Sequence, residues 1–215
     1  MHYLSCELTK IGIDLQEARF IPDNAAKIID DVRCLSSKYD YVFTSGGIGP
    51  THDDITADCI AAAFETEISI REDAFNLLEN YYSEQNIDFN SARQRMARIP
   101  NGAKLIDNPI SVAPGFYLNN VFVMAGVPNI FQSMVQSILP LLVNGTPVVS
   151  KSVRLPRGEG EIAVELKKIA SEHKSVSLGS YPYNNKGNFG TNIVVRGTNN
   201  EELDRVAEKL KSKLL

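Results

Sequence analysis

The sequence has few cysteines, which removes two classes of small protein from consideration. Only three occur in 215 residues, at Cys6, Cys34 and Cys59. Their number is odd, they lie far apart, and no pair has the close spacing of a zinc site. A disulfide-stabilised scaffold and a zinc module are therefore not expected. All three fall in helix-like stretches, and we expect them to be reduced residues of the core, where free cysteine is usually found.

Long apolar runs and blocks of like charge are also lacking. No stretch approaches the roughly 20 apolar residues of a membrane-spanning helix, and the start "MHYLSCELTK" has none of the regions of a signal peptide. We therefore expect a cytoplasmic protein with no membrane partner. A net charge of −4 and the absence of a long basic block give no reason to expect nucleic acid as a partner. The composition, 43% apolar and 22% charged, is that of an ordinary globular protein.

Strand-like and helix-like segments alternate over the first two thirds of the chain. Apolar residues at helical spacing predict helices around residues 4–11, 25–35, 56–64, 77–82, 92–98 and 134–141. Strands are predicted at "LQEARFI", "YVFTS" and "VFVM". This order predicts an α/β fold, namely a three-layer αβα domain with a mostly parallel sheet and helices on both faces.

A second, smaller domain is predicted after the turn-rich segment "VNGTPVVS". We place the boundary so that the domains are 1–145 and 146–215. The second is expected to be α+β, with a strand at 147–155, a helix through Ile162 and Ile169, a strand pair around "NNKGNFG" and a last helix. The "GNFG" glycines have the spacing of a KH loop, but that loop joins two helices and this one joins two strands, so RNA binding is not expected.

The segment "TSGGIGPTHDDIT", residues 44–56, carries the chemistry of the first domain. A glycine turn at the carboxyl end of a parallel strand lets backbone N–H groups converge on an anion, and the start of the next helix adds a favourable dipole. The turn lacks the Lys-Ser/Thr ending of a P-loop and the third glycine of the dinucleotide fingerprint. It therefore predicts an anion site that belongs to neither of these two motifs.

Asp53 and Asp54 directly follow this turn and would repel a phosphate unless a cation lay between them. We therefore predict a divalent metal, Mg, Mn or Co, held by Asp53 and Asp54. The alternative is structural, because Asp54 is also a good N-cap for the helix that begins near Thr56. His52 lies inside the motif and could contact phosphate or metal, but the other two histidines are distant in sequence, so a His-based cluster is not expected.

Three arginines in "ARQRMAR" are further candidates. Arg93, Arg95 and Arg98 could each reach an anionic ligand, because a guanidinium group matches phosphate in a fork geometry. The alternative is that they form a solvated helix face. The sequence does not decide between these two interpretations.

Four segments together resemble one known family. "TSGGIGPTHDDIT", "FIPDN", "MARIPNGAKLIDNPISVAPGF" and "VFVMAGVPNIF" occur in the family's order. They are similar to the molybdopterin-binding (MoaB/Mog-like) domain family, and above all to its branch with competence/damage-inducible protein A (CinA) and the domain fused to FAD synthases. The resemblance covers about residues 2–143. The second domain resembles the small domain that follows in CinA.

The resemblance implies a site for a phosphorylated pterin or nucleotide at the carboxyl ends of the strands. Asp54 and Asp23 match acidic positions that are essential in the family, and we predict both as catalytic. Asp23 could instead be an N-cap. The predicted ligand-binding and phosphate-binding residues are Thr44, Ser45, Gly46, Gly47, Gly49, Pro50, Pro114, Gly115, Gly126 and Pro128. Because relatives are oligomers, a homo-oligomer is expected.

One feature departs from the family pattern. Family members begin with a strand and a Gly-Asp/Asn-Glu turn before their first helix, whereas this sequence starts inside what should be that helix. We therefore expect the first domain to lack the family's first strand, which would leave neighbouring strands with unpaired backbone groups.

Two functions of different class follow. One is a metal-dependent hydrolase that cleaves the pyrophosphate bond of an ADP-ribose-like or FAD-like dinucleotide. The other is a module that binds molybdopterin or a nucleotide without cleaving it, or that serves molybdenum cofactor biosynthesis through molybdopterin adenylylation. The paired aspartates favour the first, and the missing segment favours the second.

Overall fold

The computed structural model describes residues 1–185 and 187–215, so that Lys186 lies outside the described residues. The chain divides into two compact units. One comprises Gln16–Val143, and the other comprises Met1–Leu15 together with Asn144–Leu215. The domain boundary predicted between residues 145 and 146 remains a prediction. Each unit is described by itself below.

The sheet at the centre of the 16–143 unit is mixed. Its strand order is β1-β6-β5-β4, where β1 and β6 run parallel and the other neighbours run antiparallel. The fold class is the predicted α/β, but the expectation of a mostly parallel sheet needs this correction. Asn119 and Asn120 alone connect β5 to β6, and a connection that short can only join antiparallel strands. The strands are β1 (Val42–Ser45), β4 (Lys104–Ile106), β5 (Gly115–Leu118) and β6 (Val121–Met124).

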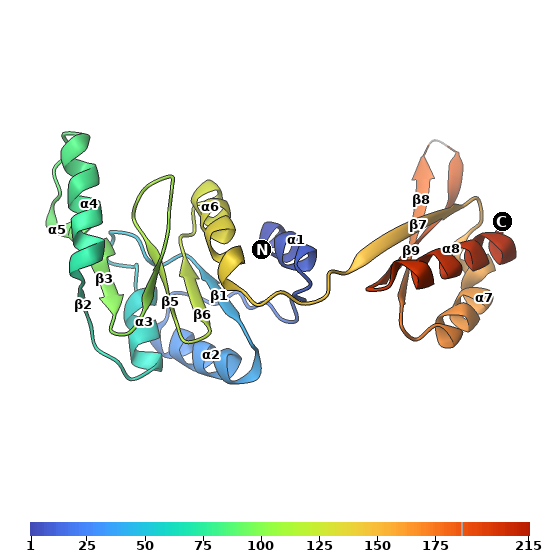
Figure 1. Cartoon of the computed structure of the whole chain (residues 1–215), viewed down its shortest axis with the longest axis horizontal. Coiled ribbons are helices and arrows are strands. Elements are labelled where there is room, and N and C mark those ends of the chain that lie inside the picture. The colour runs from blue at the N-terminus through green and yellow to red at the C-terminus, as the bar shows by residue number, and fades with distance from the viewer. Residues whose placement is uncertain (186) are drawn as a thin grey trace. The chain divides into compact units, whose positions relative to one another are not determined.

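Helices cover both faces of this sheet, as Figure 1 shows for α2 (Ala25–Lys38) and α6 (Pro128–Ile138). All four residues of β6 are buried. Val121 and Val123 join one core cluster with residues of α2 and of α3 (Thr56–Ala63). Because alternate side chains of a strand point to opposite faces, Phe122 and Met124 point to the other face, where the backbone N–H of Ala125 donates to Met134 Sδ of α6 at 3.3 Å. The α-β-α layering is therefore as predicted.

The other helices of this unit agree with the helical spacing in the sequence. They are α2 (Ala25–Lys38), α3 (Thr56–Ala63), α4 (Glu72–Glu84), α5 (Ser91–Gln94), the 3-10 turns Arg95–Ala97 and Leu139–Leu141, and α6 (Pro128–Ile138). A separate antiparallel pair is formed by β2 (Ile68–Ile70) and β3 (Arg98–Pro100).

The strand predicted at "LQEARFI" is absent from the structure. Exposure alternates along residues 13–20 as it would in a strand, but no strand is assigned there. The reason is the lack of a partner, because a strand needs a neighbour with which to exchange backbone hydrogen bonds. Among the described residues, β1 likewise pairs only with β6, so that its other edge carries no strand.

The other unit contains helix α1 (His2–Lys10), as predicted for the start of the chain, and a three-stranded antiparallel sheet. Its strand order is β7-β9-β8. Two helices supply the rest of its core, which includes Ile162 and Ile169 from one helix and Leu203 and Leu210 from the other. The elements are β7 (Val149–Leu155), α7 (Glu159–Glu172), β8 (Ser177–Asn185), β9 (Asn188–Gly197) and α8 (Asn200–Leu214). This arrangement confirms the predicted small α+β region and its strand pair.

The prediction that all three cysteines lie in the core is wrong for two of them. All three are free and lie in helices, but only Cys59 is buried, whereas Cys6 and Cys34 are exposed. Cys34 lies off the apolar face of α2, which buries Ile28 and Val32. Among the described residues, no helix combines the length and the apolar character that crossing a membrane would need.

Candidate functional site

The glycine turn lies at the edge of the sheet where parallel strands β1 and β6 both end. Ser45 pairs with Met124 in the strand register, and the N–H of Gly46 continues the ladder by donating to the carbonyl of Met124 at 2.9 Å. The turn after β1 and the turn after β6 are therefore neighbours. A Cβ placed on Gly126 would lie 3.1 Å from the Cα of Gly46, so the two turns touch through their glycines.

The predicted glycines of the first turn are required by close contacts and by backbone conformation. Gly46 and Gly47 have φ of +101° and +70°, in the region that favours glycine. A Cβ on Gly47 would lie 2.0 Å from the hydroxyl oxygen of buried Thr56, whose own N–H donates to the carbonyl of Gly47 at 2.9 Å. A Cβ on Gly49 would lie 2.7 Å from a carboxylate oxygen of Asp54. The turn is thus packed tightly onto the start of α3.

Asp54 organises this turn and does not cap the helix. Its carboxylate accepts from the backbone N–H of Thr51 at 2.8 Å and from the Thr51 hydroxyl at 2.6 Å. The N-cap of α3 is Ile55, without a side-chain cap, so the alternative interpretation of Asp54 as N-cap is wrong. Burial raises the pKa of the Asp54 carboxyl, but the hydrogen bonds from Thr51 and from the backbone of Gly49 outweigh it and leave the pKa below its usual value.

Asp53 lies on the outer side of the same loop. Its side chain is 67% exposed, and the Nδ1 of His52 lies 3.9 Å from its carboxylate. A hydrogen bond from Thr51 is the main cause that lowers the pKa of Asp53. Both aspartates are thus ionised near neutral pH, one half-buried within the loop and the other open to solvent.

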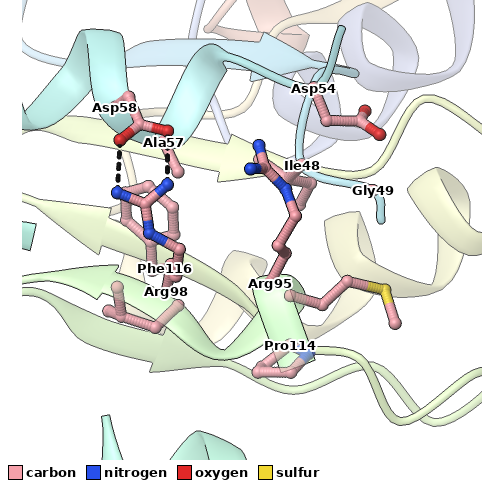
Figure 2. A pocket seen from close by; sticks show the side chains of 11 residues that line it. Ile48, Gly49, Asp54, Ala57, Asp58, Arg95, Arg98, Pro114 and Phe116 are labelled. Atoms are coloured by element: carbon pink, nitrogen blue, oxygen red, sulfur yellow. Dashed lines mark hydrogen bonds and ion pairs between the residues drawn. The ribbon is translucent and has the colours of Figure 1, made fainter. Parts of the chain in front are cut away.

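A pocket opens beside the turn, lined by the glycine loop, α3, β3, β5 and the segment that carries the arginines (Figure 2). Asp54 and Gly49 line one side, and Pro114 and Phe116 line another. The pocket therefore unites three predicted site residues, Gly49, Asp54 and Pro114, from loops more than 50 residues apart in the chain. Its full lining is Ile48, Gly49, Asp54, Ala57, Asp58, Arg95, Met96, Arg98, Ile99, Pro114 and Phe116.

The structure separates the three candidate arginines into different environments. Arg98 donates both Nη atoms to the carboxylate of Asp58, at 3.0 and 2.7 Å, so its charge is neutralised by a bidentate pair. Arg93 lies over the ring of Tyr82, 4.9 Å from its centroid, and donates to the carbonyl of Asp88. Arg95 lines the pocket, and its Nε is buried with no hydrogen-bond partner among the described residues.

The remaining predicted site residues lie at or just after the ends of β1 and β6, or within β5. Thr44 ends in a buried hydroxyl that has no partner among the described residues. Ser45, Pro50, Gly126 and Pro128 are exposed at the same edge of the sheet, and Pro128 is the first residue of α6. Gly115 is buried in β5, where a Cβ would lie 2.5 Å from the carbonyl oxygen of Val123, so its role is close packing of strands.

Asp23 does not line the pocket. It is exposed and lies one residue before the N-cap of α2, which is Asn24, whose side chain accepts from the N–H of Lys27 at 3.0 Å. The alternative interpretation of Asp23 as N-cap is therefore wrong, while its predicted catalytic role stays a prediction.

The carboxylates of the site can hold a divalent cation only if a bound ligand supplies further oxygen atoms. Among the described residues, no three His, Cys, Asp or Glu side chains lie close enough together to hold a metal by themselves. Asp53 and Asp54 could supply two carboxylates. Mg²⁺ is usually held in this way, by one or two carboxylates with the remaining positions filled by phosphate oxygens and water.

Comparison with known proteins identifies the family of the chain. Residues 1–144 match the family model described as "Probable molybdopterin binding domain", which accounts for most of the chain. The chain belongs to the molybdopterin-binding (MoaB/Mog-like) domain family. Residues 147–215 of this family member match a second model, "FAD synthase, middle domain".

Its relatives point to the CinA branch of the molybdopterin-binding domain family. The crystal structure of the CinA protein of Thermoplasma acidophilum, whose function is given as unknown, superposes with a TM-score of 0.60 at 27% identity, over 66% of this chain and 85% of that one. A CinA-like protein of a Sulfurihydrogenibium species is 27% identical over 99% of this chain. The chain spans about half of that relative, 52% of its length. A protein of Archaeoglobus fulgidus is 30% identical over 84% of this chain and 76% of its own length.

Proposed function

We propose that the pocket beside the glycine turn binds the phosphates of a nucleotide or phosphorylated pterin, and that it cleaves the pyrophosphate bond of an ADP-ribose-like or FAD-like dinucleotide with a divalent cation. One observation carries this proposal. Gly49, in the glycine turn that follows parallel strand β1, lines the same pocket as Asp54. Membership of a molybdopterin-binding family and the match to an FAD synthase domain support a ligand of this class.

Each part of the site has a role in this proposal. The N–H groups of Gly47 and Ile48 and of the first turn of α3 would bind phosphate oxygens. Those of Gly46, Gly49 and Thr51 already donate within the fold. Asp53 and Asp54 would hold the cation together with the ligand's phosphates, and Asp54 would keep the loop in shape through Thr51. When bound, the cation neutralises charge on the phosphates and lowers the pKa of water.

The proposed reaction is a hydrolysis, so no oxidant or second substrate is needed. A water oxygen bonds to one phosphorus, the bridging P–O bond breaks with the other phosphate as leaving group, and the two water protons pass to the phosphate products or to solvent. ADP-ribose would give AMP and ribose 5-phosphate, and FAD would give AMP and FMN.

The direct test is incubation of the whole chain with ADP-ribose or FAD in the presence of Mg, Mn or Co, with AMP release followed by chromatography. We expect AMP from at least one dinucleotide, and a loss of at least tenfold in rate for Asp53→Asn and Asp54→Asn. Asp40→Asn is a matched control, because Asp40 is exposed and precedes β1 at the end opposite the site. Activity that is unchanged in Asp54→Asn would contradict the assigned roles.

A second function is favoured by the position of Asp54. Its carboxylate already accepts two hydrogen bonds from Thr51, and a carboxylate that holds a loop is less free to bind a cation. A module that binds molybdopterin or a nucleotide without cleavage, or that takes part in molybdopterin adenylylation, would need only the anion site. Tight binding of ADP-ribose by calorimetry, with no AMP formed with any of the three metals, would favour this second function over hydrolysis.

A further inference from the structure

The pocket contains a positive charge of its own, which the acidic sequence motif does not reveal. Two arginines and two aspartates line it. Arg98 and Asp58 neutralise each other in a bidentate pair. Arg95 and Asp54 remain, and no ion pair joins them or involves Arg95 elsewhere in the described part of the chain.

Arg95 extends into the pocket. In Figure 2 its guanidinium group reaches toward Ile48, in the space between the Asp58–Arg98 pair and the carboxylate of Asp54. Its Nε is one of the few buried side-chain nitrogen or oxygen atoms without a partner among the described residues. Buried polar atoms are nearly always hydrogen-bonded, and an exception calls for an explanation. An anion in the pocket would give the guanidinium group of Arg95 a hydrogen-bonding partner.

We propose that Arg95 is the anion-binding residue of this pocket and that it binds two oxygens of a phosphate or pyrophosphate group through its planar fork. The guanidinium group is always charged and presents donors at the spacing of two phosphate oxygens. A phosphate bound next to Asp53 and Asp54 needs a positive charge nearby. Arg95 supplies part of that charge. Pyrophosphate therefore binds here without a divalent cation, and the cation is needed for hydrolysis alone.

This inference concerns the same pocket as the proposed function and rests on its being a phosphate site, but it is independent of cleavage. The experiment is titration calorimetry of the whole chain with inorganic pyrophosphate in EDTA. We expect wild-type protein to bind, Arg95→Gln to bind at least tenfold more weakly, and Arg95→Lys to fall between them, because lysine keeps the charge but loses the fork.

Arg93→Gln is the matched control. Arg93 lies two residues from Arg95 in the sequence, but it lies over the ring of Tyr82 and does not line the pocket. We therefore expect the affinity of the Arg93→Gln variant for pyrophosphate to stay within about twofold of wild type. Arg98 is not a suitable control because its removal would leave Asp58 unpaired in the pocket.

Thermal unfolding tests the same inference and guards against a folding defect. Arg95→Gln removes a buried nitrogen that has no partner, so the variant without ligand should melt no lower than wild type. Pyrophosphate should raise the Tm of wild type and of Arg93→Gln, but not that of Arg95→Gln, because only binding to the folded state shifts the Tm.

The outcomes separate this inference from hydrolysis. Equal binding of pyrophosphate by wild type and Arg95→Gln would overturn the role of Arg95, even if AMP release showed the protein to be a hydrolase. Binding that required Mg would do the same, and so would a wild type that bound no pyrophosphate. Arg95-dependent binding in EDTA would support the inference whether or not any dinucleotide is cleaved.

Discussion

The two compact units of the chain differ in how completely their buried polar groups are satisfied. Three buried side-chain atoms lack a partner among the described residues, namely Asp31 Oδ2, Thr44 Oγ1 and Arg95 Nε, and all three lie in the 16–143 unit. Two of them belong to the candidate site. The described residues of the other unit have no such atom, and their buried Thr191 donates to the carbonyl of Arg157 at 2.9 Å.

A buried polar atom without a partner reduces stability, so it indicates a position where the residue has a role other than stabilising the fold. Proteins usually break local rules of polar satisfaction and packing at functional sites and obey them elsewhere. In the small unit, which is Met1–Leu15 together with Asn144–Leu215, no described side-chain nitrogen or oxygen atom is buried without a partner. Matched substitutions in the two units test this contrast.

The largest effect is expected for alanine at Gly47. Its φ of +70° is unfavourable for any residue with a Cβ, and that Cβ would lie 2.0 Å from the Thr56 hydroxyl and 3.0 Å from the Thr56 Cβ. We expect Gly47→Ala to lower the free energy of unfolding by about 3 kcal/mol. Urea unfolding followed by circular dichroism measures this change.

Gly160→Ala is its counterpart in the small unit. Gly160 lies in the first turn of α7, and nothing is within 4 Å of the position of its Cβ. Alanine favours the helix, so this variant should gain up to about 1 kcal/mol in stability. If both variants lost a similar amount of stability, the close contacts around Gly47 would not be the reason that this turn has glycine.

Asp31 should show the second largest effect. It is buried in α2 and accepts hydrogen bonds from Arg19 Nη1 at 2.5 Å and Lys27 Nζ at 2.9 Å. We expect Asp31→Asn to destabilise the protein by about 2 kcal/mol, because Lys27 loses its charged partner and Arg19 keeps only Glu17. Asp204→Asn in the small unit removes the partner of Lys151, but Asp204 is 63% exposed and its loss should change stability by less than about 0.5 kcal/mol.

The pH dependence of the Asp31 effect has a defined sign. The hydrogen bond from Lys27 is the main cause that lowers the pKa of Asp31 below its usual value, and Arg19 lowers it further, while burial opposes them. A lowered pKa means that the folded protein holds the carboxylate charged, so the stabilisation is present above the unfolded pKa of about 4 and is lost as the pH falls through the folded pKa. The difference between wild type and Asp31→Asn should therefore shrink below about pH 4. A difference that stayed constant would contradict the ionic origin of the effect.

The elements with local signals were the predictable part of the fold. Helical spacing placed α2, α3, α6 and α8, and the "YVFTS" run placed β1. The "LQEARFI" segment has equally good alternation, but whether such a segment is a strand depends on a neighbouring strand, which its own residues do not encode. The two-residue connection between β5 and β6 makes these strands antiparallel. That connection could be recognised only after both strands had been located.

The site was predictable where the backbone itself is the functional group. Glycines and a following aspartate in "GGIGPTHDD" indicated the turn, but not that Asp54 bonds to Thr51 instead of capping α3. The three arginines could not be separated, because their roles depend on Tyr82 and Asp58, which are distant in sequence. That Arg95 Nε has no partner in the described part of the chain is a property of the folded state and leaves no pattern in the sequence.

The smallest effects are expected at two helix caps, where the two units should behave alike. Asn24 accepts from the N–H of Lys27 at 3.0 Å at the start of α2, and Asn199 accepts from the N–H groups of Glu201 and Glu202 at 2.9 and 3.2 Å at the start of α8. Alanine at either position removes one cap of the same kind, so each variant should lose about 1 kcal/mol in urea unfolding. If the two variants lose equal stability, the units differ at the site and in their buried charges but not in the capping of their helices. If Asn24→Ala cost much less than Asn199→Ala, helix α2 would be held mainly by its contacts with the sheet, and the contrast would extend to how the two units form their helices.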